Sequence, residues 1–198
     1  MIRKIFCSAA KHTAVFAVVL FLLWLLLFLS ALIPNDMIRD NMEQSALSYK
    51  ERTAFEFADG KKLNSVADHY ADSIWLNVSW NMGEDSPLIS SIRTNYYDGG
   101  ELGVNAGLYL SVTQGTEPNK DYTRYWHGTV MFIRLGHLIT DVEGVKLIGF
   151  IAFLLLVGLS LFILARKRHW DLAVILALSL AAVQIWNIRL SMEYQPGF

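Results

Sequence analysis

Three long apolar stretches divide the sequence into hydrophobic and polar parts. Residues 13–34, 146–165 and 171–188 are almost entirely hydrophobic, with no charged side chain beyond the first residue of each stretch. A helix rises about 1.5 Å per residue, so about 20 residues cross a hydrocarbon core about 30 Å thick. The pattern therefore predicts an all-α membrane protein with three transmembrane helices.

The polar stretch between the first two apolar runs, residues 35–145, is predicted to form one mainly helical extracytoplasmic domain. Three of its segments carry apolar residues three or four positions apart, the spacing of one helix face. Each segment follows a typical helix start: Asn35 or Asp36, then Ser65, then Ser86-Pro87. The apolar positions are Ile38, Met42, Ala46 and Tyr49 in the first segment, Val66, Tyr70, Ile74 and Val78 in the second, and Leu88, Ile92 and Tyr96 in the third.

Two further segments of this domain give mixed signals. Residues 105–114 alternate in hydrophobicity like a strand, yet glycines interrupt and follow them as in a loop. We assign this segment to a helix. Residues 53–63 alternate as well, and Asp59-Gly60 fits the two-residue turn of a hairpin, so one small hairpin is expected there.

Lysine and arginine residues indicate how the chain is oriented in the membrane. Three of them lie within residues 1–12, and Arg166-Lys167-Arg168 fill the turn between the second and third stretches. Basic residues next to a span are retained on the cytoplasmic side. We therefore predict that residues 1–12 and 166–170 are cytoplasmic, and that 35–145 and the tail 189–198 are extracytoplasmic.

The charges of the central domain differ from those of the flanking segments. Residues 35–145 contain 16 acidic and 9 basic residues, a net charge of −7, although the whole chain has a formal net charge of only −1. Phosphate backbones are bound by clustered basic surfaces. The acidic domain therefore argues against a nucleic-acid partner.

The first apolar run has an alternative interpretation as a cleaved secretory signal. Its apolar core is longer than the usual 7 to 15 residues of a signal peptide, and Ala31 is a poor cleavage site. These features favour an uncleaved anchor. The single cysteine, Cys7, precedes the run and excludes a disulfide within the chain.

A cluster of basic and aromatic residues follows residue 120. If residues 124–139 continue as one helix, Arg124, His127 and Arg134 share a face, and Tyr125 and Trp126 add amphipathic rings. One interpretation is an interfacial anchor, because such helices lie at headgroup depth. The other is that these five residues bind the diphosphate of a lipid-linked substrate, since guanidinium groups match phosphate oxygens in pairs.

Short sequence words carry a resemblance to other membrane proteins. A span ending in Ile33-Pro34-Asn35, the word Tyr70-Ala71-Asp72-Ser73-Ile74 and the word Arg124-Tyr125-Trp126-His127-Gly128, followed by apolar spans, resemble poorly characterised bacterial polytopic membrane proteins of the cell envelope. The resemblance implies a bacterial cytoplasmic (inner) membrane location. It also implies that relatives continue beyond this C-terminus.

A weaker resemblance is to membrane glycosyltransferases that use polyprenyl-phosphate sugars. In that family the first outer loop begins with an acid near the bilayer, and Asp36 and Asp40 occupy comparable positions here. The resemblance implies that one of them deprotonates an acceptor hydroxyl, which requires a distance of about 3 Å. The alternative is that Asp36 caps a helix and Asp40 is a first-turn acid. The paired acids and arginine typical of the family form no recognisable motif.

Motifs for metals and cofactors are weak or missing in the sequence. Asp68, His69 and Asp72 make a partial ligand set without a second histidine at useful spacing, and an exposed acidic face explains them equally well. No glycine-rich phosphate loop, serine elbow or dithiol motif occurs. We therefore predict no metal and no cofactor.

Together these patterns predict a multi-pass membrane protein of the cell envelope. Its extracytoplasmic domain is expected to bind a membrane-borne ligand, such as a polyprenyl phosphate or a phospholipid headgroup, or a membrane protein partner. The alternative function is the N-terminal part of a lipid-linked sugar glycosyltransferase. A transporter is disfavoured, because no charged residue marks a pathway inside the spans. Whether the chain is an enzyme is left open.

Overall fold

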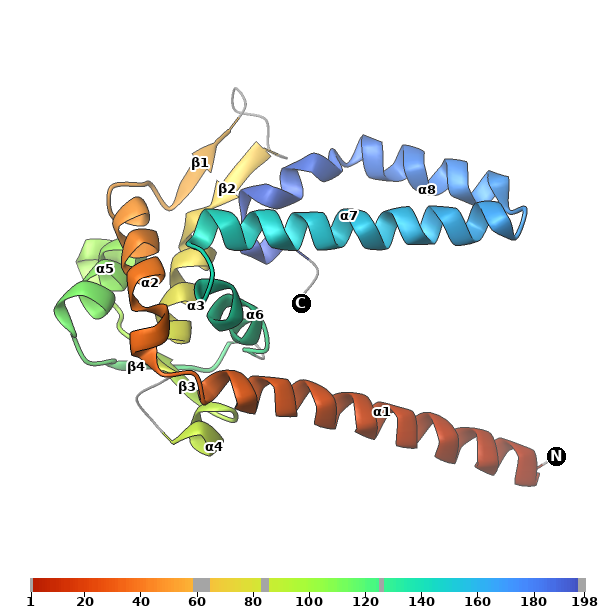
Figure 1. Cartoon of the computed structure of the whole chain (residues 1–198), viewed down its shortest axis with the longest axis horizontal. Helices are drawn as coiled ribbons and strands as arrows, with labels where there is room; N and C mark the ends of the chain where they lie inside the picture. Colours follow the sequence, from red (N-terminus) through yellow and green to blue (C-terminus); the bar gives the residue numbers. More distant parts are fainter. Residues whose placement is uncertain (1, 59–64, 83–85, 125–126, 196–198) are drawn as a thin grey trace.

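The computed structural model describes residues 2–58, 65–82, 86–124 and 127–195 and is mainly helical (Figure 1). A domain of short helices and two small hairpins forms one end of the molecule. Three apolar helices, α1, α7 and α8, extend from it toward the same side.

Helix α1 (Ile2–Ala31) is the first of these, and Pro34 separates it from α2 (Asn35–Lys50). Proline lacks the N–H that a continuing helix needs, so the chain turns here. Pro34 itself occupies the N-cap position of α2 without a side-chain hydrogen bond. The prediction that Asn35 or Asp36 caps this helix is therefore wrong. The Asn35 amide instead donates to the Trp80 carbonyl over 3.0 Å.

Helices α7 (Val142–Arg166) and α8 (Trp170–Ala182) form an antiparallel hairpin that extends from the domain toward the same side as α1 (Figure 1). By length and composition, Ala10–Ala31 and Val142–Arg166 can each cross a membrane. Helix α8 has 13 residues and is followed by the 3₁₀ helix η3 (Ile185–Leu190). It is shorter than a spanning helix, so the predicted third span stays a prediction.

The domain is organised around helix α3, whose residues from 72 to 81 are all buried. Helices α2, α5 and α6 pack against it. The segment from 105 to 114 belongs to α5, which confirms its assignment to a helix. The bounds of the domain helices are His69–Asn81 for α3, Pro87–Ser90 for α4, Gly103–Gln114 for α5 and Val130–His137 for α6, with 3₁₀ helices η2 at Gly100–Leu102 and η4 at Met192–Tyr194.

The hydrophobic core of the domain includes the inner ends of two apolar helices. Leu27 of α1 and Val142 of α7 are both fully buried and belong to the same cluster as the α3 residues Leu76 and Val78. Met192, close to the C-terminus, joins the same cluster. Helices α1 and α7 are therefore packed into the core of the domain at the ends nearest to it, and are not joined to it by flexible linkers alone.

Two short antiparallel hairpins complete the domain. β1 (Phe55–Phe57) pairs with β2 (Val66–Asp68), and β3 (Thr94–Tyr96) pairs with β4 (Lys120–Tyr122). A small hairpin does form here, but its second strand begins at Val66, beyond the predicted segment, and with Phe57 opposite Val66 eight residues separate the two strands. The predicted two-residue turn is therefore wrong, and Asp59-Gly60 itself lies outside the described residues.

Both hairpins shorten helices that the sequence pattern predicts. The predicted second helix begins at His69 and not at Val66, because β2 takes up the three residues before it. Asp68, and not Ser65, caps it by accepting the Ala71 N–H over 2.8 Å. The predicted third helix stops at Ser90, because Thr94–Tyr96 pairs with a strand far along the chain.

Candidate functional site

A buried carboxylate, Asp72, lies at the centre of the contact between the domain and α7. Its Oδ2 accepts a hydrogen bond from the Tyr49 hydroxyl (2.8 Å) and faces the Lys146 ammonium (3.0 Å). Its Oδ1 accepts hydrogen bonds from the Ser191 hydroxyl (2.7 Å) and the Met192 N–H (2.8 Å). Both oxygens are therefore fully hydrogen-bonded, as a buried carboxylate requires.

The proton positions in this cluster follow from its partners. Lys146 also donates to the Tyr49 oxygen over 2.6 Å, and an ammonium group can only donate. Burial and the neighbouring Asp72 charge raise the pKa of Tyr49, so its phenol keeps its proton and donates it to Asp72. We call Tyr49, Asp72, Lys146 and Ser191 the junction cluster. It joins α2, α3, α7 and the segment before η4.

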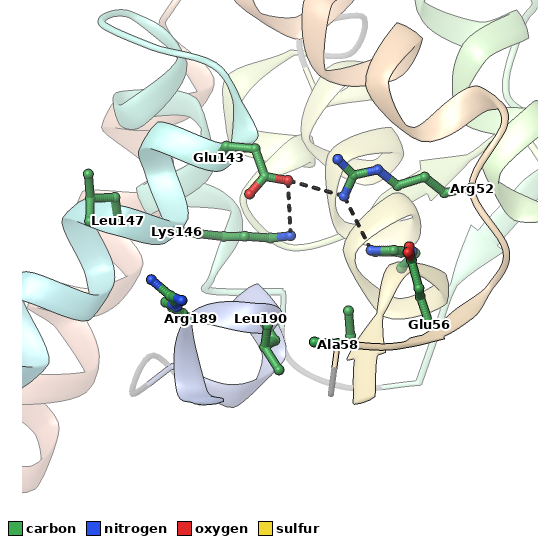
Figure 2. A pocket seen from close by; sticks show the side chains of 10 residues that line it. Arg52, Glu56, Ala58, Glu143, Lys146, Leu147, Arg189 and Leu190 are labelled. Carbon is green, nitrogen blue, oxygen red and sulfur yellow. Dashed lines mark hydrogen bonds and ion pairs between the residues drawn. The ribbon is translucent and has the colours of Figure 1, made fainter. Parts of the chain in front are cut away.

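A cavity of about 430 Å³ opens beside the junction cluster, where α7 leaves the domain. Figure 2 shows Arg52, Glu143 and Lys146 pointing toward one another across it. We call this cavity the junction pocket. Its lining comprises Arg52, Glu56, Ala58, Ala67, His69, Glu143, Lys146, Leu147, Arg189 and Leu190.

Arg52 is held by partners on two sides of the junction pocket. One of its terminal nitrogens lies 3.2 Å from Glu143 and 3.3 Å from Nε2 of His69. A guanidinium can only donate, so Nε2 of His69 is the acceptor. Nδ1 then carries the ring proton and donates it to the Thr53 carbonyl over 3.0 Å.

Arg189 is the other arginine of the junction pocket and differs from Arg52 in its contacts. Its side chain is exposed, and within the described part of the chain it has no hydrogen bond or ion pair. Lys146 is neutralised by Asp72, and Arg52 is paired with Glu143. Among the described residues that line this pocket, Arg189 is therefore the cation that is free to meet an incoming anion.

The predicted cationic stripe at residues 124–134 is not formed. Helix α6 begins at Val130, after His127, so one helix face cannot carry all three cations. Arg124 is exposed beyond strand β4, whereas His127 is buried with its Nε2 3.2 Å from the Ser90 carbonyl. Burial lowers the pKa of His127. Tyr125 and Trp126 lie outside the described residues.

The sequence pattern predicts that Arg134 faces a ligand, but its side chain is fully buried. Its guanidinium donates to the Ser30 carbonyl (3.0 Å), the Ile33 carbonyl and the Asn35 side chain (3.1 Å), and also to the Ser79 carbonyl (2.5 Å). Burial lowers its pKa to about 10, which leaves it charged at neutral pH. With its donors engaged, it closes off the carbonyl end of α1 and does not offer a phosphate site.

The two acids of the glycosyltransferase hypothesis lie on the exposed side of α2. Asp36 forms an ion pair with Arg39 over 2.7 Å, and its side chain is 85% exposed. Asp40 is exposed one turn further along the helix. Neither lines the junction pocket, and their proposed role as a base stays a prediction.

The partial ligand set noted in the sequence does not converge on one point. Asp68 caps α3, His69 contacts Arg52 and Thr53, and Asp72 belongs to the junction cluster. Among the described residues no group of three or more His, Cys, Asp or Glu side chains could hold a metal ion.

Sequence reasoning missed the residues that the structure brings together here. Asp72 and Lys146 are 74 positions apart, and no local spacing links them. One signal was present: Lys146 and Glu143 are charged residues at the entry of an otherwise apolar helix, where a charge needs a partner.

Comparison of the chain with protein-family models, with curated proteins and with solved structures gave no match.

Proposed function

We propose that this chain is a multi-pass membrane protein of the bacterial cell envelope whose extracytoplasmic domain binds a phosphate-bearing, membrane-borne ligand in the junction pocket. The observation that carries the proposal is the position of that pocket. Arg52, Lys146 and Arg189 line it at the base of α7, and Leu147 and Leu190 border it.

The exposure of the apolar helices supports insertion in a membrane. A soluble protein buries its most apolar helix, yet in the most apolar window of Val142–Arg166 no residue is buried, and in that of Ala10–Ala31 only 17% are. Apolar surfaces of this extent need a cover, and lipid provides one.

The arrangement of the helix ends supports the proposed orientation. The N-terminus and the turn between α7 and α8 lie at the same end of the molecule, away from the domain (Figure 1). Both segments are rich in lysine and arginine, which favours the cytoplasmic side for both. The domain is then extracytoplasmic.

A third crossing is part of this proposal. The Met192 N–H bonds to Asp72 in the domain, so the chain returns from the α7–α8 turn to the domain side. Helix α8 and the part of η3 up to Ile188 rise about 20 Å and about 8 Å, which together approach the thickness of a core of about 30 Å and leave Arg189 at its outer edge.

Three basic side chains line the junction pocket against two acidic ones, Glu56 and Glu143, and this excess favours a phosphate group over a neutral headgroup. Arg189 is available, and Arg52 can exchange its half-exposed partner Glu143 for a phosphate oxygen. Guanidinium groups bind phosphate through paired donors. The ligand's hydrocarbon part would follow Leu147 onto the apolar surface of α7.

Native mass spectrometry of the delipidated full chain in detergent tests the proposal. The probes are undecaprenyl phosphate, phosphatidic acid and undecaprenol. They distinguish binding of a polyprenyl phosphate from binding of a phospholipid headgroup and from binding of the polyprenyl hydrocarbon without a phosphate. We expect at least one phosphate-bearing probe to bind, and Arg189→Gln to weaken that binding at least fivefold. Arg39→Gln removes the same charge from an exposed site outside the pocket and should bind like the wild type.

Two results would overturn the proposal. One is undecaprenol binding as tightly as undecaprenyl phosphate, because the phosphate would then contribute nothing. The other is unchanged binding of the phosphate-bearing probes by both Arg189→Gln and Arg52→Gln.

A further inference from the structure

A second cavity, of about 750 Å³, lies on the other face of the β1–β2 hairpin. Successive side chains of a strand point to opposite faces, and the pairing register fixes which ones share a face. Glu56 and Ala67 are register partners and line the junction pocket, whereas Phe55 and Asp68 are register partners and line the second cavity. The hairpin therefore separates two distinct sites.

Aromatic rings form much of the wall of this second cavity. Phe55 and Tyr70 are stacked with ring centroids 6.3 Å apart and planes 13° apart, and they are 55% and 37% exposed. Trp75 and Tyr122 line the cavity as well, with centroids 5.3 Å apart. Exposed aromatic pairs of this kind offer flat apolar faces to a ligand.

The polar groups of the cavity combine hydrogen-bond donors and acceptors. Asp68 and Glu193 contribute carboxyl groups, and Arg124 contributes a guanidinium. Partial burial, and then a hydrogen bond to Asp68, raise the pKa of Glu193. Arg124 therefore supplies hydrogen-bond donors, and the two carboxyl groups supply acceptors.

We infer that this second cavity is a carbohydrate-binding cleft, in which Phe55 and Tyr70 stack on the apolar face of a sugar ring while Asp68, Glu193 and Arg124 bind its hydroxyls. Sugars present a C–H face that packs on aromatic rings and an edge of hydroxyls that both donate and accept. A cationic ligand is opposed by Arg124, and an anionic ligand by the two acids. The inference rests on this cavity alone and does not require the proposed phosphate site.

The experiment measures sugar binding to the full chain in lipid nanodiscs, since alkyl-maltoside detergents would themselves present sugars. The probes are maltotetraose, cellotetraose and tri-N-acetylchitotriose, detected by ligand-observed saturation-transfer NMR and by tryptophan fluorescence. We expect saturable binding of at least one probe. Phe55→Ala and Tyr70→Ala should each weaken it at least tenfold.

A matched control lies on the same strand. Phe57 is also exposed, points to the same face two residues further on, and does not line the cavity. Phe57→Ala should bind the probe like the wild type, and so should Arg189→Gln, which alters only the junction pocket. The second control keeps the two proposals separable.

Three outcomes would overturn the inference. The first is no saturable binding of any of the three sugars at millimolar concentration. The second is binding that Phe57→Ala weakens as much as Phe55→Ala does. The third is saturable binding of choline, displaced by none of the sugars, which would make the cavity a cation site.

Discussion

The two apolar helices that meet the spanning length are fixed to the domain by different means. Arg134 holds the end of α1 through carbonyl groups and one side-chain amide, and no carboxylate of the described residues contacts it. Lys146 at the start of α7 is paired with a buried carboxylate. The first attachment uses the negative end of a helix dipole to stabilise a cation, and the second uses a full opposite charge. The two should therefore respond differently to substitution.

Lys146→Met should have the largest effect. It leaves the Asp72 charge buried without its cation, which costs about 3–5 kcal/mol of unfolding free energy. The double variant Asp72→Asn, Lys146→Met should recover part of that loss, because no uncompensated charge remains. Thermal unfolding in detergent, followed by circular dichroism, measures both. A double variant no more stable than Lys146→Met would contradict the charge-pair account.

Arg134→Met should cost about 3 kcal/mol, because it leaves several carbonyl groups without donors. Its partners carry no formal charge, so removing one of them cannot rescue it. Asn35→Ala combined with Arg134→Met should be no more stable than Arg134→Met alone. Rescue by that second substitution would show that the two attachments behave alike.

Acid should lower the free energy of unfolding through His137, which lies on α6 with Arg134. Burial lowers the pKa of His137 from 6.5 to about 4, so the unfolded chain binds the proton more readily. The contribution of neutral His137 to the free energy of unfolding is fully present above pH 6.5 and is lost as the pH falls toward 4. The loss is about 2 kcal/mol between pH 7.5 and pH 5. Melting temperatures across this range should fall less for His137→Gln than for the wild type. An equal fall in melting temperature with pH for the wild type and His137→Gln would show that His137 does not cause the acid sensitivity.

The surface pair on α2 should have the smallest effect. Asp36→Asn breaks an exposed ion pair with Arg39 and should cost less than about 0.5 kcal/mol. The same thermal unfolding assay measures it, with the wild type as reference. A loss above about 1 kcal/mol would mean that the pair supports the α1–α2 turn.

Apolar runs and helical spacing in the sequence are sufficient to predict the helices whose formation depends on hydrophobicity alone. The apolar runs predict α1 and α7, and the spacing of Ile38, Met42, Ala46 and Tyr49 predicts the buried face of α2. These elements follow from local composition, so no knowledge of distant contacts is needed.

Elements that depend on distant partners were predicted poorly. The local spacing predicts a helix at Thr94–Tyr96, because it cannot identify the partner strand Lys120–Tyr122. The same limit applies to the site. The pattern predicts an exposed Arg134, because its buried acceptors at Ser30, Ile33 and Ser79 are 55 or more positions away.

Cysteine accessibility in intact cells tests the central claim that the domain and its junction pocket face outward. In a Cys7→Ser background, Glu117→Cys places a thiol on an exposed loop of the domain, and Lys167→Cys places one in the α7–α8 turn. An impermeant maleimide should label position 117 in intact cells and position 167 only after permeabilisation. Labelling at 167 with none at 117 in intact cells would contradict the account.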